Sequence, residues 1–211
     1  MKNIPFVEGI KEFKNIHFKE NEILFNELVE KGQNPKALFI GCSDSRIIPT
    51  LITNSKPGDL FVVRNIGNMV PPFKPDDDFH GTAAAIEYAV SVLNVEDIIV
   101  CGHSKCGMCR ALYEQDKIAG IELIHVKNWL KLGDDVKEQV LSIYKKNPNI
   151  DMYELTEKVN VLYQLKNLLT YPKIKEKVEN NSLRLHSWYY RIETGEIEFY
   201  NSETNKFEKI V

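Results

Sequence analysis

The sequence predicts one α/β domain on a mostly parallel sheet, preceded by a helical N-terminal arm. Short apolar runs typical of buried strands alternate with longer segments whose apolar residues recur at helical spacing. Two of these runs, residues 36–41 and 97–102, end directly in groups of cysteine, histidine and charged residues. The 211 residues suffice for one sizeable core, and contents of 43% hydrophobic and 27% charged residues are ordinary for a globular protein.

The first half of the chain begins with a segment of helical periodicity. Residues 8–31 have apolar residues at the spacing of one or two amphipathic helices, and Gly32 is placed to end them. We expect residues 1–32 to form the arm and residues 33–211 the α/β domain. The elements expected next are strands over 36–41 and 59–64, a loop rich in proline and aspartate over 70–79, and a helix over 82–93.

The second half continues the alternation. A strand over 97–102 leads into a loop at His103, and a helix begins at Cys106 and runs to Gln115. Further helices are expected over 121–132, 134–146 and 152–170, and late strands over 183–192 and 196–200. The sequence contains no internal repeat, low-complexity tract or linker, which indicates a single domain overall.

Charge and hydropathy narrow the class of partner. A net charge of −3 and a pI near 6.0 do not suggest a nucleic-acid or membrane partner. No apolar run is long enough to span a membrane, and the first thirteen residues lack the apolar core of a secretory signal. We therefore expect a cytoplasmic protein that binds neither nucleic acid nor a membrane.

Three residues at two predicted strand ends suggest a metal site. Cys42 follows one strand, and His103 and Cys106 follow another. The carboxyl ends of neighbouring parallel strands meet at one edge of a sheet, so these side chains can converge. Two thiolates and one imidazole are a three-ligand zinc set, and a fourth position left for water is typical of catalytic zinc. The alternative is two buried cysteines and a core histidine.

Asp44 and Arg46 lie two residues apart next to Cys42, so their side chains can point the same way and pair. Two thiolates neutralise Zn²⁺, so we expect its water to be less acidic than at an all-histidine site. Arg46 would hold the carboxylate of Asp44, which would accept a hydrogen bond from a zinc-bound hydroxide and orient it. The alternative is a purely structural ion pair.

Three sequence blocks resemble the signature of the β-class carbonic anhydrases: GCSDSR at 41–46, VRNIGN at 63–68 and CGHSKCG at 101–107. The resemblance spans roughly residues 33–112. It implies an α/β fold, a Zn²⁺ ion on Cys42, His103 and Cys106, and a catalytic dyad of Asp44 and Arg46. It also implies a homodimer or a multiple of dimers, with active sites at the subunit interface and helical arms that embrace the neighbour.

NMVPPF at 68–73 and AIEYAV at 85–90 are similar to the plant-like branch of that family. This resemblance implies a pocket for CO2 and bicarbonate formed by Gln33, Phe61, Tyr88 and the backbone of Gly107. In the other branch a tryptophan stands where this chain has Phe39. We therefore expect an open zinc site at neutral pH, with Asp44 off the metal. Met108 replaces a second glycine that is usual in the family, and this substitution can alter packing or access.

The predicted function is zinc-dependent interconversion of CO2 and water with bicarbonate and a proton, which makes the chain a carbonate dehydratase. One alternative is the same scaffold acting on carbon disulfide or carbonyl sulfide, and another is a non-catalytic zinc-binding regulator. Cys106 and Cys109 also form a C-x-x-C pair, which can be a redox motif. Here the context favours a zinc ligand at Cys106 and an inward-packed Cys109, and Cys101 is expected in the core.

Overall fold

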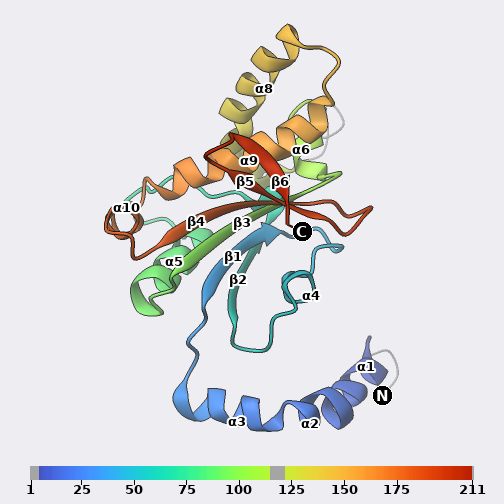
Figure 1. Cartoon of the computed structure of the whole chain (residues 1–211), viewed down its shortest axis with the longest axis vertical. Helices are drawn as coiled ribbons and strands as arrows, with labels where there is room; N and C mark the ends of the chain where they lie inside the picture. The colour runs from blue at the N-terminus through green and yellow to red at the C-terminus, as the bar shows by residue number, and fades with distance from the viewer. Residues whose placement is uncertain (1–4, 115–121, 211) are drawn as a thin grey trace.

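The computed structural model describes residues 5–114 and 122–210 and is built on a six-stranded sheet. The strand order is β2-β1-β3-β4-β5-β6. The strands are β1 (Ala37–Cys42), β2 (Leu60–Asn65), β3 (Asp97–His103), β4 (Arg184–Tyr190), β5 (Ile197–Asn201) and β6 (Lys206–Lys209). β2, β1, β3 and β4 run parallel, and the hairpin of β5 and β6 continues the sheet antiparallel (Figure 1).

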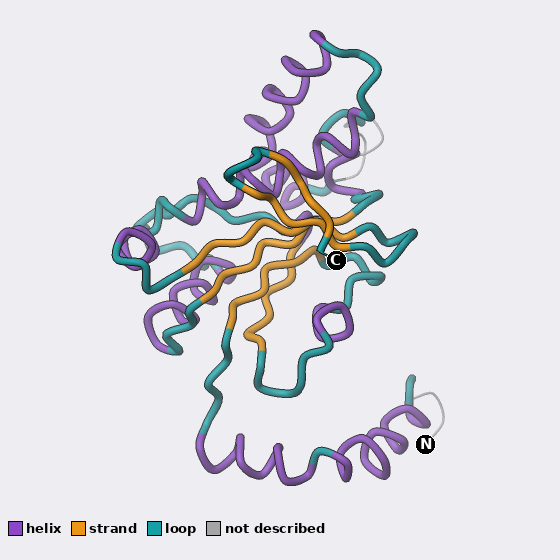
Figure 2. Tube along the Cα trace, viewed as in Figure 1, coloured by secondary structure: helices purple, strands orange, loops and turns teal. Residues whose placement is uncertain are grey.

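Helical segments connect and flank the strands (Figure 2). Before β1 lie α1 (Val7–Glu12), the π-helical turn η1 (Phe13–His17), α2 (Phe18–Glu20) and α3 (Glu22–Lys31). Between β1 and β3 lie α4 (Pro49–Thr53), the 3-10 turn η2 (Ile66–Asn68), α5 (Gly81–Glu87) and the π turn η3 (Tyr88–Val92). After β3 come α6 (Gly107–Ala111), α7 (Ile124–Leu130), the 3-10 turn η5 (Lys131–Gly133), α8 (Asp134–Lys146), α9 (Met152–Leu168) and α10 (Pro172–Glu179).

The main core lies between one face of the sheet and the helices α5, α9 and α10. Because side chains alternate along a strand, every second residue of β1 and β3 points to this face. The buried residues that meet here include Leu38, Ile40, Ile98 and Val100 from the strands and Ile86, Val161, Leu168 and Ile174 from the helices. The opposite face carries a smaller group around Phe39 and Cys101, and its members all come from strands. β1 and β3 are therefore buried on both faces. This packing holds in place their carboxyl ends, where Cys42 and His103 lie.

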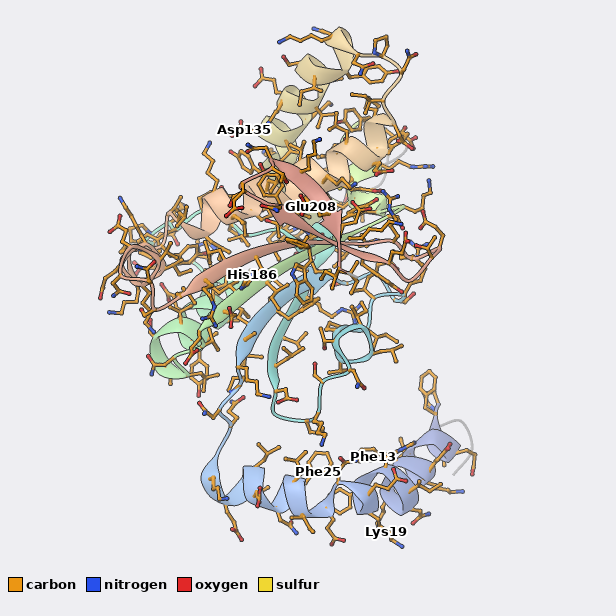
Figure 3. All side chains as sticks on the ribbon, in the orientation of Figure 1. Phe13, Lys19, Phe25, Asp135, His186 and Glu208 are labelled. Carbon is orange, nitrogen blue, oxygen red and sulfur yellow. The ribbon has the colours of Figure 1, made fainter. Side chains whose placement is uncertain are left out.

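The N-terminal arm, formed by α1 to α3, runs apart from the sheet along the lower edge of the view in Figure 1. Phe13, Phe18 and Phe25 pack on one another, with the Phe18 and Phe25 rings stacked at 5.4 Å (Phe13 and Phe25 are labelled in Figure 3). Leu28 touches Gly58 in the loop before β2. Several large apolar side chains of the arm are exposed in a single chain: Phe6, Ile10, Phe13, Ile16, Ile23 and Val29. The arm therefore has an apolar surface that is exposed in the part of the chain that the structure describes.

The predicted fold class is confirmed, and most predicted elements lie within a residue or two of the observed ones. The helix predicted to run from Cys106 to Gln115 ends at Ala111. Gln115 lies outside the described residues, and so does Ile121, the first residue of the next predicted helix. Three elements were not predicted from the sequence: the short helix α4, the helix α10 and the edge strand β6. Among the described residues, no helix is both long enough and apolar enough to cross a membrane.

Candidate metal centre and active site

The two sequence blocks that carry the metal-ligand candidates meet at the carboxyl edge of the sheet. β1 and β3 are neighbours in register, with Gly41 opposite Cys101. Cys42 is the last residue of β1 and His103 the last of β3, while Cys106 is the N-cap of α6. The two sulfur atoms and a ring nitrogen of His103 all lie within 4.8 Å of one another, and all three residues are buried. The structure thus brings together the three residues that the sequence predicted as ligands.

His103 has one ring nitrogen in this group that carries no proton. His103 Nδ1 lies 2.9 Å from the carbonyl oxygen of Ser104, and a carbonyl only accepts, so Nδ1 carries the proton. Nε2 then keeps a lone pair, and it is buried with no hydrogen-bond partner among residues 5–114 and 122–210. An unpaired buried acceptor is costly unless something binds it. Its position beside two thiols fits a metal ion, with the bond to Ser104 fixing the tautomer.

The two thiols are protonated in the metal-free chain. The pKa of Cys42 is raised to about 12, first by its hydrogen bond with Cys106 and then by burial. The pKa of Cys106 is raised as well, first by a hydrogen bond with the Cys109 thiol. Because a thiolate is the ligand form, binding of a metal must displace these protons.

Asp44 and Arg46 form a bidentate pair beside the three ligand candidates. Arg46 Nε donates to Asp44 Oδ1 at 2.9 Å, and Nη2 donates to Oδ2 at 2.7 Å. The backbone N–H of Arg46 also donates to Oδ1. These charge-assisted bonds hold the pKa of Asp44 well below its usual range. Arg46 Nη2 lies 3.3 Å from the carbonyl oxygen of Lys105, which ties the pair to the loop that carries Cys106.

Two further residues hold the segments that carry Cys42, Asp44 and Cys106. Neither of them was predicted to have a role in the site. Arg64 on β2 donates to the carbonyl oxygens of Cys42 and Asp44. Glu157 on α9 accepts from the backbone N–H of Cys106 at 2.9 Å and from the Tyr189 hydroxyl at 2.7 Å. Burial raises the pKa of Glu157. Arg64 belongs to the VRNIGN block at 63–68, so the sequence offered a signal for it. Glu157 is 51 residues from Cys106, and no local spacing connects the two.

Comparison with known proteins decides the family. A family model described as carbonic anhydrase matches residues 37–197, which include every residue of this cluster. The chain belongs to the β-carbonic anhydrase family. Members of this family interconvert CO2 and bicarbonate, and the chain is a carbonate dehydratase.

Relatives cover nearly all of this β-carbonic anhydrase. It is 42% identical to a carbonic anhydrase of Synechocystis over 95% of this chain and 72% of the relative. It is 38% identical to a carbonic anhydrase of Helicobacter pylori over 96% of this chain and 92% of the relative. Its structure matches that of the β-carbonic anhydrase CcaA with a TM-score of 0.89 and 41% identity, over 97% of both chains. A tetrameric β-carbonic anhydrase from Sordaria macrospora matches with a TM-score of 0.79 and 31% identity, over 92% of this chain and 93% of the other.

The predicted substrate residues of this carbonic anhydrase are not all near the cysteines and histidine. Phe61 and Tyr88 face each other with ring centroids 6.0 Å apart. Phe61 is opposite Leu38, four residues before Cys42 on β1, a distance of roughly 13 Å along a strand. Gln33 is exposed in the segment between α3 and β1. Within one chain, therefore, only Gly107 of the four predicted residues is next to a ligand candidate.

Proposed function

We propose that Cys42, His103 and Cys106 hold one Zn²⁺ ion and that CO2 and bicarbonate are interconverted at this centre. The observation that carries the proposal is the buried, unpartnered Nε2 of His103 within 4.8 Å of two cysteine sulfurs. Two soft thiolates and an imidazole are a donor set that zinc prefers, and three protein ligands leave one position free. When bound, zinc supplies a nucleophile near neutral pH by lowering the pKa of water.

Asp44 is the residue we propose to orient the attacking oxygen. A carboxylate offers about four acceptor positions. The Oδ1 atom already accepts two hydrogen bonds from Arg46, whereas Oδ2 accepts one. Oδ2 therefore keeps a lone pair that can accept a hydrogen bond from the nucleophile. Arg46 fixes the direction of this lone pair and keeps the carboxylate ionised, which also favours the open form of the site with Asp44 off the metal.

The substrate pocket in our proposal combines two copies of the chain. The aromatic walls of Phe61 and Tyr88 suit CO2, which is small and apolar, and the amide of Gln33 can hydrogen-bond bicarbonate. These three residues lie far from the metal ligands of the same chain. In our proposal, each metal centre is therefore completed by the pocket residues of a second copy. Gly107 serves the same pocket through its backbone N–H.

The assembly that we propose is a homodimer or a multiple of dimers. Residues 1–32 act as an arm over the neighbouring copy, and residues 33–211 form the catalytic domain. The exposed apolar side chains of the arm support this assignment. We also propose the cytoplasm as the compartment, because all four cysteines are free thiols.

The decisive experiment is stopped-flow CO2 hydration with a pH indicator, on zinc-replete protein from neutral to alkaline pH. We expect fast turnover that rises with pH, since two thiolates leave the zinc less able to acidify water. A Cys106→Ser variant should lose both metal and turnover. Absence of turnover at every pH with one zinc bound per chain would refute the proposal, and assays with carbon disulfide and carbonyl sulfide would then separate a related hydrolase from a regulator.

A further inference from the structure

Cys109 is a buried thiol in contact with a metal-ligand candidate but outside the group of three. It is 1% exposed and lies in the same buried cluster as Cys106. The group at this edge of the sheet that could share an ion consists of Cys42, His103 and Cys106, without Cys109. The metal site described above therefore gives Cys109 no role.

The local backbone keeps Cys106 and Cys109 close together in one buried cluster. Cys106 is the extended N-cap of α6, with φ −68° and ψ 118°, and Cys109 lies in the first turn of that helix. The pair belongs to one short segment, so a bond between the two sulfurs would close a small loop without moving a strand. Cys101 is different: it lies on β3, and burial alone raises the pKa of its thiol to about 12.

A small polar cavity lies beside Cys106. A cavity of about 40 Å³ is lined by Cys106, Tyr189 and Arg191 and by the exposed residues Lys105 and Glu193. This volume exceeds what a single water molecule needs. The next residue, Gly107, is exposed, and apart from its chain neighbours and its own helix backbone no heavy atom of the described residues lies within 4 Å of the position that a Cβ would take there. Hydrogen peroxide is a polar molecule only slightly larger than water and fits the cavity beside Cys106.

We propose that Cys106 and Cys109 form a peroxide-sensitive disulfide whose formation releases the metal. Peroxide transfers one oxygen to the sulfur of Cys106, giving a sulfenic acid and water. The Cys109 thiol then attacks that sulfur, an S–S bond forms, and a second water leaves. In sum, two thiols lose two electrons and two protons, and one peroxide becomes two waters. The inference rests on the proposed zinc site, since the disulfide removes one of its three ligands.

Cys109 has a protective effect in this scheme. A sulfenic acid that finds a neighbouring thiol stops at the reversible disulfide, whereas one without such a neighbour goes on to sulfinic and sulfonic acids, which thiols do not reduce. A dithiol reductant would restore Cys106 in the parent protein, and with it the metal site. The pair thus makes loss of zinc reversible.

The test uses the full-length, zinc-loaded protein treated with hydrogen peroxide. Trypsin cleaves after Lys105 and Arg110, so residues 106–110 leave as one peptide containing both thiols. We expect this peptide to become about 2 Da lighter when the disulfide forms. One zinc per chain should appear with a chromogenic chelator in step with the mass change. Dithiothreitol followed by zinc should restore both the peptide mass and the metal content.

Two variants make the outcome specific. In Cys109→Ser the same treatment should add oxygen to Cys106 in steps of about 16 Da, and reductant should not restore zinc binding. Cys101→Ala, which removes a buried thiol outside the pair, should behave as the parent does. A cross-linked peptide joining Cys42 to Cys106, or the same reversible zinc loss in Cys109→Ser and the parent, would overturn the inference. Should the untreated protein bind no zinc, the proposed function fails, and the mass of peptide 106–110 still decides the disulfide.

Discussion

At the scale of single residues, hydrogen bonds set the state of the groups in the candidate active site. The carbonyl of Ser104 selects the tautomer of His103, and Arg46 keeps Asp44 ionised. Glu157 accepts from the backbone of one ligand and from a tyrosine hydroxyl. These contacts lead to three predictions, each on one carboxyl group.

Asp44→Asn should retain zinc and lose activity. An amide has one acceptor atom instead of two. The lone pair of Oδ2 that we propose to accept a hydrogen bond from the attacking oxygen is therefore lost or replaced by an N–H donor. We expect a fall in kcat of about 10²-fold or more, the usual scale for a positioned proton acceptor. The measurement is CO2 hydration at matched zinc content. Asp59→Asn, which alters a carboxylate paired with Lys36 away from the site, is the control, and equal turnover in both variants would contradict the role of Asp44.

The pair of Asp44 and Arg46 also predicts an acid dependence of stability. The pKa of Asp44 in the folded chain lies below its ordinary value of 3.8, so as the pH falls the unfolded chain takes up the proton first. The stabilisation is therefore present above that ordinary value and is lost as the pH falls toward the folded pKa. We expect the difference in unfolding free energy between metal-free parent and Asp44→Asn to be constant above about pH 5 and to shrink below about pH 4. A difference that grows on acidification would exclude this pair as the cause.

Glu157→Gln should weaken the fold. Both carboxylate oxygens accept a hydrogen bond, whereas glutamine offers one acceptor, so either the N–H of Cys106 or the O–H of Tyr189 loses its acceptor. An unpaired buried donor costs about 1–3 kcal/mol. Urea unfolding of the metal-free protein measures this cost, and the exposed Glu179→Gln provides the baseline. A shift no larger than that of the control would show that water replaces the lost acceptor.

At the scale of elements, η2 and α6 fit together through one glycine and one methionine. Gly67 has φ +76°, and a Cβ there would lie 2.2 Å from the terminal methyl of Met108. Met108 is buried, and it stands at the position where the resemblance led us to expect a glycine. It therefore fills space against the loop that follows β2. Asn160 on α9 and Trp129 on α7 hold the same loop by hydrogen bonds to the carbonyl oxygens of Gly67 and Ile66.

Gly67→Ala should be destabilising by at least about 1–3 kcal/mol, because the new methyl overlaps Met108 and the left-handed backbone is strained for alanine. Met108→Ala alone should cost about 2–5 kcal/mol by opening a cavity. The double variant should lose less than the sum of the two, since the smaller residue at 108 admits the methyl at 67. Thermal or urea unfolding of the four proteins forms the cycle. Strict additivity would mean that backbone strain alone governs position 67.

At the scale of the whole molecule, one chain separates the predicted pocket from the metal ligands. Phe61 and Tyr88 lie toward the start of the parallel strands, and Cys42 and His103 lie at their ends. The arm carries large apolar side chains that are exposed among the described residues. The association with a second copy that we propose would explain both features.

Deletion of residues 1–31 should give a monomer that still binds zinc but has lost most of its turnover. The metal ligands all lie in the remaining chain, whereas the pocket residues of a neighbour would no longer be held in place. Light scattering after size exclusion, metal content and CO2 hydration give the three readouts. A fully active monomer would refute the shared pocket, and a dimer with full activity would show that the arm is dispensable for assembly.

The sequence alone determined the fold class, most of the elements and the three residues that meet at the candidate metal centre. It could do so because buried strands, helical periodicity and ligand chemistry are local patterns, and because parallel neighbouring strands bring their carboxyl ends to one edge. The Asp44–Arg46 pair was equally local, two residues apart on one loop. Short elements such as α4 and β6 were missed because five or four residues carry too little periodicity to be recognised.

The rest depended on contacts between distant segments. That Glu157 accepts from Cys106, that Arg64 holds the loop of Cys42 and Asp44, and that Met108 fills the space beside Gly67 all follow from how α9, β2 and α6 pack. Side-chain burial was equally non-local: Tyr88 lies among apolar residues in the sequence, yet it is 45% exposed in the single chain. Local spacing reports on a residue's own element, whereas hydrogen-bond partners and burial are set by the elements packed against it, and only the folded chain brings these together.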